Sequence, residues 1–503
     1  MLEEKYREYI SALPLMTLRI LGREKGVPPR LLGNKPELVE GLVEILMGKR
    51  PAVPRSGRGA PVKQNFLDPA VLVRLENIRR EYEGKDILEE SAYPEEIESF
   101  EDEVRISPAR MTVRDSETVR SIFDQPVYTG ILEIMQNGYG FLRAKNCQPT
   151  NGDVFIPAPL IHALKLREGD FVACSVKPRE DTSAVRMRVK NDSAALDQVF
   201  TVNNLPVGKY EQRPFFDALT ACYADEKIAF SKDESKLSLR VLDLFAPIGK
   251  GQRALIIAPP TAGKTTLLKD IARAIAEHHE EINLIVLLID ERPEEVTDIR
   301  QSVENAEVVY STFDEGADHH VRAAELTIAH AKRMAEMGKD VVILLDSLTK
   351  LTRAYNYIAE STGKTLSGGL EAGALAEPKR FFGAARNTME AGSITILATA
   401  LVDTGSRMDD VIYEEFKGTG NSDIFLSREL AERRIFPAID IRRSGTRKEE
   451  MLLSDAELNA VYKLRERGLT ESVDGILDML KKTENNEEFV SRLGEWLKVY
   501  KVK

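Results

Sequence analysis

The chain has 503 residues, of which 43% are hydrophobic and 7% aromatic, and its formal net charge is −11. This length predicts about three domains, and we expect a globular, cytoplasmic protein. Cys147, Cys174 and Cys222 are odd in number and widely spaced, which argues against a disulfide framework and a CxxC metal site. The amino-terminal segment mixes charged with apolar residues, so it lacks the core of a secretory signal or membrane span.

Charge is segregated along the chain. Residues 86–103 hold nine carboxylates and no lysine or arginine, whereas residues 179–190 and 428–448 are locally basic. Clustered lysine and arginine bind nucleic-acid phosphates, so local patches decide such binding rather than the net charge. The acidic average therefore does not exclude a nucleic-acid-binding protein.

The amino-terminal third divides into a helical part and an insert. Residues 1–48 show apolar residues at helical spacing, interrupted by VPPRLLGNKP, and predict a small helical module. Residues 49–125 begin with a stretch rich in proline, glycine and basic residues and continue with the acidic run. Such compositions bury too little apolar surface to fold, so we expect a disordered insert.

Short alternating apolar runs begin near Val127. TGILEIM, GYGFLRA, DVFIPAP, DFVACSVKP and VRMRVK predict five strands of a small β-barrel over residues 126–195, followed by a connector over 196–235. Tyr139 and Phe141 alternate on one of these strands, which suits either the barrel core or a binding face.

Residues 236–503 predict an α/β domain. The apolar runs RALIIA, NLIVLLID, DVVILLD and ITILATAL alternate with amphipathic helical segments. Continuous apolar strands with intervening helices indicate a mostly parallel sheet covered on both faces. Ligands bind such sheets at the carboxyl ends of the strands.

A phosphate loop follows the first of these strands. The segment APPTAGKTT, residues 258–266, lies between a strand and a helix, with Ala258 where the motif usually has glycine. In this context backbone N–H groups cradle phosphates, Lys264 reaches the β- and γ-phosphates and the Thr265 hydroxyl binds magnesium. A Gly-Lys-Thr turn without function fits the flanking strand and helix poorly.

Acidic residues close two further strands. Asp346 ends VVILLD and suits magnesium coordination, while Asp290, Glu291 and Arg292 follow LIVLLI. Glu291 is the better candidate to polarise an attacking water, and Arg292 to sense the γ-phosphate. The alternative is that these acids cap the next helices.

The segment RRIFPAIDIRRSGTRKEE is rich in arginine. One arginine from it would be able to supply transition-state charge to a neighbouring site. On charge alone, surface arginines without function fit equally well. The candidates are Arg433, Arg434, Arg442, Arg443 and Arg447.

Long segments of the chain resemble the bacterial transcription termination factor Rho family. They are APPTAGKTT, LLIDERPEEVTDI, STFDEGADHHV, LLDSLTKLTRAYN, KRFFGAARN, DTGSRMDDVIYEEFKGTGN and RRIFPAIDIRRSGTRKEE. The resemblance runs from about Thr129 to the carboxyl end, is weaker over residues 1–48 and does not include 49–125. It implies a homohexameric, ATP-driven RNA translocase that terminates transcription with RNA polymerase. The implied domains are an OB or cold-shock-type RNA-binding barrel and a RecA-like ATPase.

The resemblance also implies roles at the nucleotide site. Glu291 would be the catalytic carboxylate, acting with Lys264 and Asp346, and Arg447 would reach a neighbouring site. Phe436 would stack near adenine, and Thr261 stands where the family often has lysine. The implied nucleotide contacts are Gly249, Lys250, Gly251, Gln252, Arg253, Ala254, Thr261, Ala262, Gly263, Lys264, Thr265, Thr266, Arg292 and Phe436. ATP and Mg²⁺ are the implied cofactors.

For RNA, the resemblance implies two sites. At the primary site aromatic faces would stack unpaired bases and Arg143 would hold phosphate. Its residues are Gly138, Tyr139, Gly140, Phe141, Leu142, Arg143, Asp153, Val154 and Phe155. The family's acidic-aromatic pair near residue 185 has no clear counterpart in TSAVRMRV. STGKTLSGG and DTGSR match two loops that face the ring's pore, with contacts from Lys364, Thr365, Leu366, Ser367, Gly368, Gly369 and Arg407.

Two other functions compete with this interpretation. A rotary ATP synthase subunit shares the ring and the phosphate loop, but the GYGF barrel and the two glycine-rich loops argue against it. A non-enzymatic RNA-binding regulator would not need the intact set Lys264, Thr265, Glu291, Asp346 and Arg447.

Overall fold

The computed structural model describes residues 2–13, 35–47, 127–176, 194–207, 209–210, 212–232, 236–303, 305–360 and 365–499, with residues 18, 21, 25, 27 and 49. The chain divides into two compact units, and the larger one holds both the barrel and the parallel sheet. The expected disorder of 49–125 and the basic stretch 179–190 fall outside the described residues, apart from Lys49.

The amino-terminal unit contains helices α1 (Leu2–Ala12) and α3 (Lys35–Leu46). Their apolar residues recur at helical spacing, and Tyr6, Ile10, Leu38 and Leu42 are buried in one small core. The prediction of helices in this part of the chain is confirmed for α1 and α3.

The barrel is built from β1 (Tyr128–Ile134), β2 (Gly140–Arg143), β3 (Val154–Ile156), β4 (Phe171–Val176) and β5 (Ala194–Val202), with helix α7 (Ala158–Ala163) between β3 and β4. The strand order is β3-β2-β1-β4-β5, and β3 pairs with β5 to close the barrel. Strand β6 (Leu205–Pro206) pairs antiparallel with the end of β5. Side chains of alternate residues, including Leu132, Leu142, Val154 and Val172, fill its core.

The strand that closes the barrel was not among the predicted strands. It is β5, most of which was predicted to be connector, while the predicted strand VRMRVK lies outside the described residues. The period-two pattern of AALDQVFTV is weak, because its middle residues are polar, and this hid the strand. The rest of the predicted connector holds a short helix, η3 (Phe216–Ala218), and β7 (Ala221–Cys222), which pairs with β14 (Asn387–Thr388).

The α/β domain contains a seven-stranded sheet in the order β10-β9-β11-β15-β8-β16-β17. The strands are β8 (Arg253–Ala258), β9 (Ile282–Glu291), β10 (Glu307–Thr312), β11 (Asp340–Asp346), β15 (Ile394–Leu401), β16 (Ser422–Phe425) and β17 (Gly445–Thr446). All pairings are parallel except that of β17 with β16. The predicted mostly parallel sheet is confirmed.

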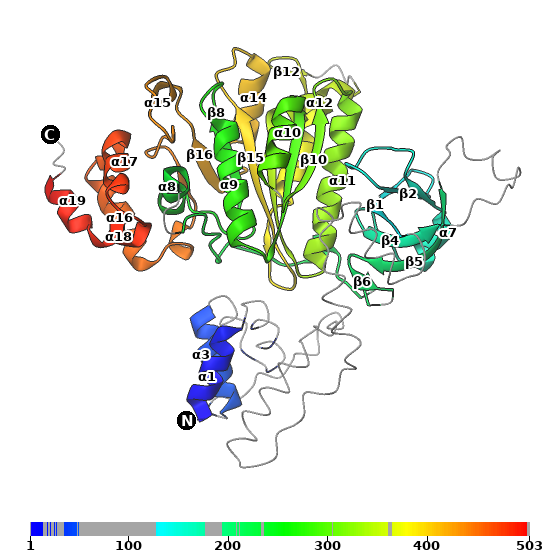
Figure 1. Cartoon of the computed structure of the whole chain (residues 1–503), viewed down its shortest axis with the longest axis horizontal. Helices are drawn as coiled ribbons and strands as arrows, with labels where there is room; N and C mark the ends of the chain where they lie inside the picture. Colours follow the sequence, from blue (N-terminus) through cyan, green and yellow to red (C-terminus); the bar gives the residue numbers. More distant parts are fainter. Residues whose placement is uncertain are drawn as a thin grey trace, which may run out of the picture. The chain divides into compact units, whose positions relative to one another are not determined.

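Helices cover both faces of this sheet (Figure 1). One face packs against α8 (Leu237–Phe245), α9 (Lys264–His278) and α10 (Pro293–Ser302). The helices α16 (Asp455–Glu466) and α17 (Val473–Lys481) join the same core by packing against α8. The helices α11 (Ala317–Glu336), α12 (Leu348–Ile358) and α14 (Arg407–Phe416) contact the central strands as well. The remaining helices are α13 (Ala376–Gly383), α15 (Arg428–Glu432), α18 (Asn486–Ser491) and α19 (Leu493–Val499). No helix in the described ranges is long and apolar enough to cross a membrane.

The barrel docks on the edge of the α/β domain through specific polar contacts. The Asn146 side chain donates to Tyr310 O and accepts from Tyr310 N, both at 2.8 Å, so it continues the hydrogen bonding of edge strand β10. Gly169 adopts φ +86°, and a Cβ there would lie 2.3 Å from the backbone of Ala329 on α11. Only glycine permits this close approach of barrel and helix.

A buried charge network reinforces the docking. Arg213 forms a bidentate pair with Asp170 at 2.5 and 2.6 Å, and Arg167 pairs with Glu336 of α11 at 2.9 Å. Arg333 also pairs with Glu336, at 2.7 Å. Because buried carboxylates need partners, this network fixes the barrel against α11.

Candidate nucleotide and RNA sites

The phosphate loop connects β8 to α9. Thr261 and Gly263 adopt left-handed φ values of +66° and +89°, and Gly263 is the N-cap of α9, which begins at Lys264. Backbone N–H groups at this helix end therefore point into the loop, as phosphate binding requires. A Cβ on Gly263 would lie 4.0 Å from Phe436 Cε1, so the exposed Phe436 ring stands beside the loop.

Three predicted catalytic residues meet at the carboxyl ends of neighbouring strands. Lys264 Nζ lies 2.5 Å from Asp346 Oδ1 at the end of β11 and 3.3 Å from Glu291 Oε1 at the end of β9. The Thr399 hydroxyl donates to Asp346 Oδ1 at 2.8 Å. Glu291 and Asp346 are both buried, and parallel pairing of β9 with β11 places them at the same edge.

Lys350 joins this cluster, and the sequence analysis missed it. Its Nζ lies 2.8 Å from Glu291 Oε1 and donates to Asp290 O at 2.6 Å. Lys350 is in the first turn of α12, which starts directly after the Asp346 strand. Its place four residues beyond Asp346 could have identified it in the sequence, since a side chain in the first turn of a helix lies near the end of the strand that precedes that helix.

The helix-capping alternative for the acids does not match the geometry. Ser347 caps α12 by accepting from Lys350 N, and Arg292 is the N-cap of α10 without a side-chain hydrogen bond. Arg292 is exposed next to Glu291. The side chains of Asp290, Glu291 and Asp346 therefore do not cap these helices.

The charges of the cluster keep Glu291 ionised. Burial alone would raise the pKa of Glu291, but the ammonium groups of Lys264 and Lys350 outweigh it and hold that pKa below its usual value. For Lys264, burial acts to lower the pKa, and the carboxylates of Asp346 and Glu291 raise it overall. The site thus carries two cations and two anions that compensate one another.

Oxygen donors suited to magnesium surround the loop. The Thr265 hydroxyl donates to Glu295 Oε2 of α10 at 3.2 Å. The Asp346 carboxylate forms an ion pair with Lys264, the first residue after the loop. Hydroxyl and carboxylate oxygens are the ligands that Mg²⁺ takes beside nucleotide phosphates. Glu295 is a second residue that the sequence analysis missed; it lies four residues after Glu291, in the first turn of α10.

The predicted contacts at residues 249–254 lie at the opposite end of β8. Gly251 adopts φ +88° and approaches Asn387 so closely that a Cβ would lie 2.1 Å from its nitrogen. Lys250 pairs with Glu226 at 2.6 Å, and Gln252 donates to Asn421 Oδ1 at 2.7 Å. Their polar groups serve internal contacts, and this fold does not bring them to the phosphate loop of the same chain. Gly249 and Ala254 are buried with them.

Arg447 also lies away from its own phosphate loop. It follows β17, and its backbone N–H donates to Asn421 O, while Asn421 N donates to Arg253 O at the start of β8. The length of β8 places this position about 16 Å along the strand from the loop. The Arg447 side chain is exposed at this edge. Burial lowers the pKa of Arg253, and the positive charges of Arg386 and Arg447 lower it further.

The aromatic residues of the barrel form one cluster. Ring centroids of Tyr139 and Phe141 are 5.8 Å apart, and those of Tyr139 and Phe155 are 5.7 Å apart. The core cluster of the barrel, which the alternate residues Leu142 and Val154 fill, contains none of the three. Phe141 is nevertheless buried, with 8% exposed, whereas Tyr139 and Phe155 are partly exposed. Of the two alternatives for this strand, the structure therefore favours an outward aromatic face.

Arg143 is placed differently from the expectation that it holds phosphate. Its guanidinium pairs with Glu133 and, at 2.7 Å, with Asp153, and only 6% of its side chain is exposed. Asp153 also accepts from Thr150 N and Oγ1, so it organises the loop before β3. Arg143 stands 4.9 Å from the centroid of the Phe141 ring. Because Arg143 is two residues from Phe141 on β2, it lies on the same face of the strand and flanks the ring.

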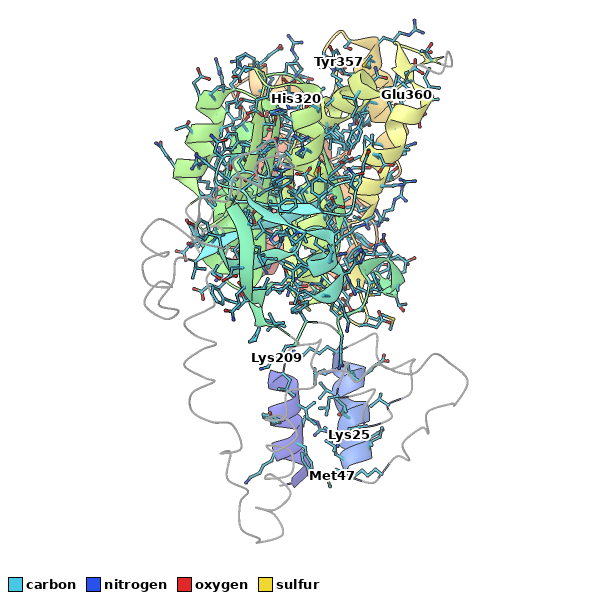
Figure 2. The ribbon with its side chains drawn as sticks, turned by 90° about the vertical axis from the view of Figure 1, so that its right-hand side faces the viewer. Lys25, Met47, Lys209, His320, Tyr357 and Glu360 are labelled. Atoms are coloured by element: carbon cyan, nitrogen blue, oxygen red, sulfur yellow. The ribbon has the colours of Figure 1, made fainter. Side chains whose placement is uncertain are left out.

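The two predicted pore loops contact each other. Residues 365–371 form a hairpin of β12 (Thr365–Leu366) and β13 (Leu370–Glu371), with Ser367, Gly368 and Gly369 in its turn. A Cβ on Gly368 would lie 2.8 Å from Met408 N, next to the exposed Arg407. Figure 2 shows Tyr357 and Glu360 at the end of α12, which leads toward this hairpin. Lys364 lies outside the described residues.

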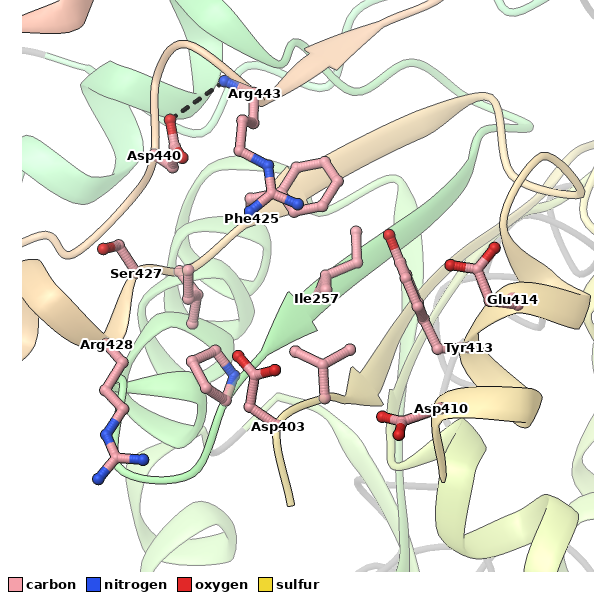
Figure 3. A pocket seen from close by; sticks show the side chains of 13 residues that line it. Ile257, Asp403, Asp410, Tyr413, Glu414, Phe425, Ser427, Arg428, Asp440 and Arg443 are labelled. Atoms are coloured by element: carbon pink, nitrogen blue, oxygen red, sulfur yellow. Dashed lines mark hydrogen bonds between the residues drawn. The ribbon is translucent and has the colours of Figure 1, made fainter. Parts of the chain in front are cut away.

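A cavity of about 480 Å³ borders the phosphate loop at Pro259. Figure 3 shows it between the carboxyl ends of β8, β15 and β16, with the Arg443 guanidinium over the Phe425 ring at 4.1 Å. Asp403, Asp410 and Glu414 line its other side. None of these residues belongs to the predicted nucleotide contacts.

Comparison with known proteins identifies both parts of the larger unit. Residues 128–207 match the family model "Rho termination factor, RNA-binding domain", and residues 238–446 match "ATP synthase alpha/beta family, nucleotide-binding domain". The barrel is therefore the OB-type RNA-binding domain that the resemblance implied. The α/β domain is the RecA-like ATPase domain that it implied.

Curated relatives decide between the families that share this nucleotide-binding domain. The transcription termination factor Rho of Bacillus subtilis is 51% identical over 73% of this chain and 85% of its own length. Those of Aquifex aeolicus and Thermotoga maritima are each 50% identical over 72% of this chain and 84% of theirs. The chain belongs to the transcription termination factor Rho family.

Proposed function

We propose that six copies of this chain form a ring that draws nascent RNA through its pore and acts on the RNA polymerase transcription complex in the cytoplasm. Family membership and the two matched domains make the chain an ATP-hydrolysing, RNA-binding termination factor. The hexamer, the polymerase partner, the location and the residue roles below are proposals.

One observation carries the catalytic part of the proposal: Glu291 is buried, ionised and held by two lysines at the phosphate loop. When ATP binds, Lys264 leaves the carboxylates for the β- and γ-phosphates. Glu291, still fixed by Lys350, then orients water and accepts its proton. Thr265 and Asp346 would hold Mg²⁺, whose charge would offset that of the phosphates. Phe436 stacks on adenine beside Gly263.

The ring itself is proposed from the position of Arg447. This arginine is exposed at the far end of β8, so the nucleotide it serves is the one on a neighbouring subunit. Arg253 is half-buried near Arg447, and its guanidinium donates to Thr419 O and Ala385 O, so it supports this edge from within the subunit. Arg447 then supplies transition-state charge between subunits.

RNA is proposed to occupy two places. Tyr139, Phe141 and Phe155 stack single-stranded bases on the barrel, as aromatic platforms do without strict sequence demands. Lys364 and Arg407 grip phosphates in the pore, where six copies of each would surround the strand.

The separate roles of Lys264 and Glu291 give the test. Lys264→Ala is expected to weaken ATP binding, because the phosphates lose their cation. Glu291→Gln is expected to bind ATP normally and to lose RNA-stimulated hydrolysis by about 100-fold or more, the range for losing a general base. Nucleotide affinity and RNA-stimulated phosphate release are measured on the same preparations. Wild-type turnover in Glu291→Gln would remove Glu291 from the catalytic role.

A further inference from the structure

A chain of ion pairs crosses from the aromatic face of the barrel to the ATPase domain. Glu133 of β1 lies opposite Phe141 of β2 in the barrel sheet. Its Oε2 accepts a hydrogen bond from Arg143, and its Oε1 accepts one from Arg322 Nε of α11 at 3.2 Å. One carboxylate therefore joins the proposed RNA surface to a helix of the ATPase.

Arg143 depends on Glu133 for its orientation. The guanidinium lies between Glu133 on one side and Asp153 on the other, and its carbon stands 4.9 Å from the Phe141 ring centroid. A planar guanidinium held by two carboxylates has a fixed plane. If Glu133 turned away, Arg143 would lose half of this clamp and the Phe141 ring would lose its support.

Glu133 needs Arg322 because other carboxylates surround it. Burial and the charges of Glu133 and Glu325 raise the pKa of Glu168. Burial raises the pKa of Glu325 as well, and Glu377 and Glu133 add to that effect. The side chain of Arg322 on α11, which is 29% exposed, forms an ion pair with Glu133. Without it, repulsion from Glu168 and Glu325 would push Glu133 out of place.

We propose that Glu133 and Arg322 are positioning residues for RNA binding: Arg322 holds Glu133, and Glu133 holds Arg143 beside the Phe141 ring. This rests on the proposed RNA site at Tyr139, Phe141 and Phe155. Binding free energies are reciprocal, so RNA bound on the barrel strengthens the docking of the barrel on α11 by the same factor. Occupancy of the primary site is thereby communicated to the ATPase domain.

The test measures the affinity of the full chain, without nucleotide, for a short fluorescein-labelled single-stranded RNA. Arg322→Ala is expected to weaken binding by about three- to tenfold. Arg322→Lys restores most of the affinity, because the ammonium still reaches the carboxylate. Lys332→Ala is the matched control, because Lys332 is on the same helix, is 28% exposed and pairs with Asp217. It binds RNA as the wild type does, and unchanged ATP binding and melting temperature show that each variant is folded.

Two further readouts separate positioning from a direct phosphate contact. A lost direct contact lowers the slope of log affinity against log salt by about one, whereas a lost positioning residue leaves the slope unchanged. Glu133→Gln combined with Arg322→Ala is expected to bind no more weakly than Glu133→Gln alone, since Arg322 acts through Glu133. Additive losses or a lower salt slope would overturn the proposal.

A Phe141→Ala variant distinguishes this inference from the proposed function beneath it. If Phe141→Ala binds RNA normally, the RNA site itself is wrongly placed. If Phe141→Ala binds weakly while Arg322→Ala matches the wild type, the RNA site stands and the link through Glu133 is wrong.

Discussion

Lys350 shares the Glu291 carboxylate with Lys264, and its charge helps to keep that carboxylate ionised. Burial raises the pKa of Glu291, and both lysines lower it. Lys350→Met is therefore expected to raise the pKa of Glu291, so that protonation removes the base at higher pH. The acidic limb of the pH profile of RNA-stimulated ATP hydrolysis shifts to higher pH. Steady-state rates across pH measure this shift.

Lys350→Arg is the control for this prediction. A guanidinium keeps the positive charge beside Glu291, so the acidic limb is expected to stay close to that of the wild type. An unshifted limb in Lys350→Met would mean that Lys350 does not set the ionisation of Glu291.

At the scale of residues, sequence predicted the groups that end strands and missed those that reach them from helices. Lys264, Glu291 and Asp346 follow apolar strands of a parallel sheet, and such ends meet at one edge. Lys350 and Glu295 lie in the first turns of the helices that follow two of these strands, and this spacing was a weak signal, because the rotation of α12 and α10 decides whether such side chains reach the strand ends. The ion pair of Arg143 with Glu133 was not predicted for a similar reason, since it depends on hairpin register.

Among the elements, the contact of the barrel with α11 depends on Gly169. A Cβ there would lie 2.3 Å from Ala329 C, and φ is +86°. Gly169→Ala combines backbone strain of about 1–3 kcal/mol with a steric clash and is expected to lower the melting temperature markedly. Gly468→Ala is the matched control, because Gly468 adopts φ +68° with no atom within 4 Å of its Cβ position. Thermal unfolding of both variants isolates the clash, and equal losses would contradict it.

Glu307 on edge strand β10 makes the same junction sensitive to pH. Its carboxylate faces His330 Nε2 at 3.9 Å, and burial raises its pKa although His330 opposes the effect. Because the folded pKa lies above the unfolded one, the chain loses stability as pH rises between them, by up to about 1.4 kcal/mol per pH unit. Glu307→Gln is expected to remove this loss. Chemical denaturation at pH 5 and pH 8 checks it: an equal effect of the variant at both values would exclude a raised pKa.

Strands with a strong apolar pattern in the sequence were predictable. Strands that depend on pairing with a distant part of the chain were not. The central strands β8, β9, β11 and β15 are continuous apolar runs and match the predicted segments. Strand β5 carries polar residues in its middle and was assigned to the connector, although it closes the barrel by pairing with β3 and β4. Strand β17 has two residues and exists only through its antiparallel pairing with β16. Long-range pairing, not local sequence, defines both strands.

For the whole molecule, sequence predicted the kinds of domain but not how the barrel attaches to the ATPase. Asn146, Gly169 and Arg213 form that junction, and each lies in a loop or turn without a recognisable motif. Only the family resemblance predicted that Arg447 serves a neighbouring subunit, and this stays a proposal. The fold shows that Arg447 stands at the end of β8 opposite its own phosphate loop.

Mixed rings test whether catalysis is shared between subunits. Arg447→Ala and Lys264→Ala are each expected to abolish RNA-stimulated hydrolysis in uniform rings. In a closed ring every interface joins two different faces, so an Arg447→Ala subunit beside a Lys264→Ala subunit forms an intact site on one side. Random mixing in equal amounts restores about a quarter of the sites, so activity peaks at intermediate ratios. Lys264→Ala mixed with the Lys264→Ala/Arg447→Ala double variant forms no intact site and serves as the control. If mixed oligomers form but activity stays absent at every ratio, Arg447 acts within its own subunit or not at all, and the proposed interface site is wrong.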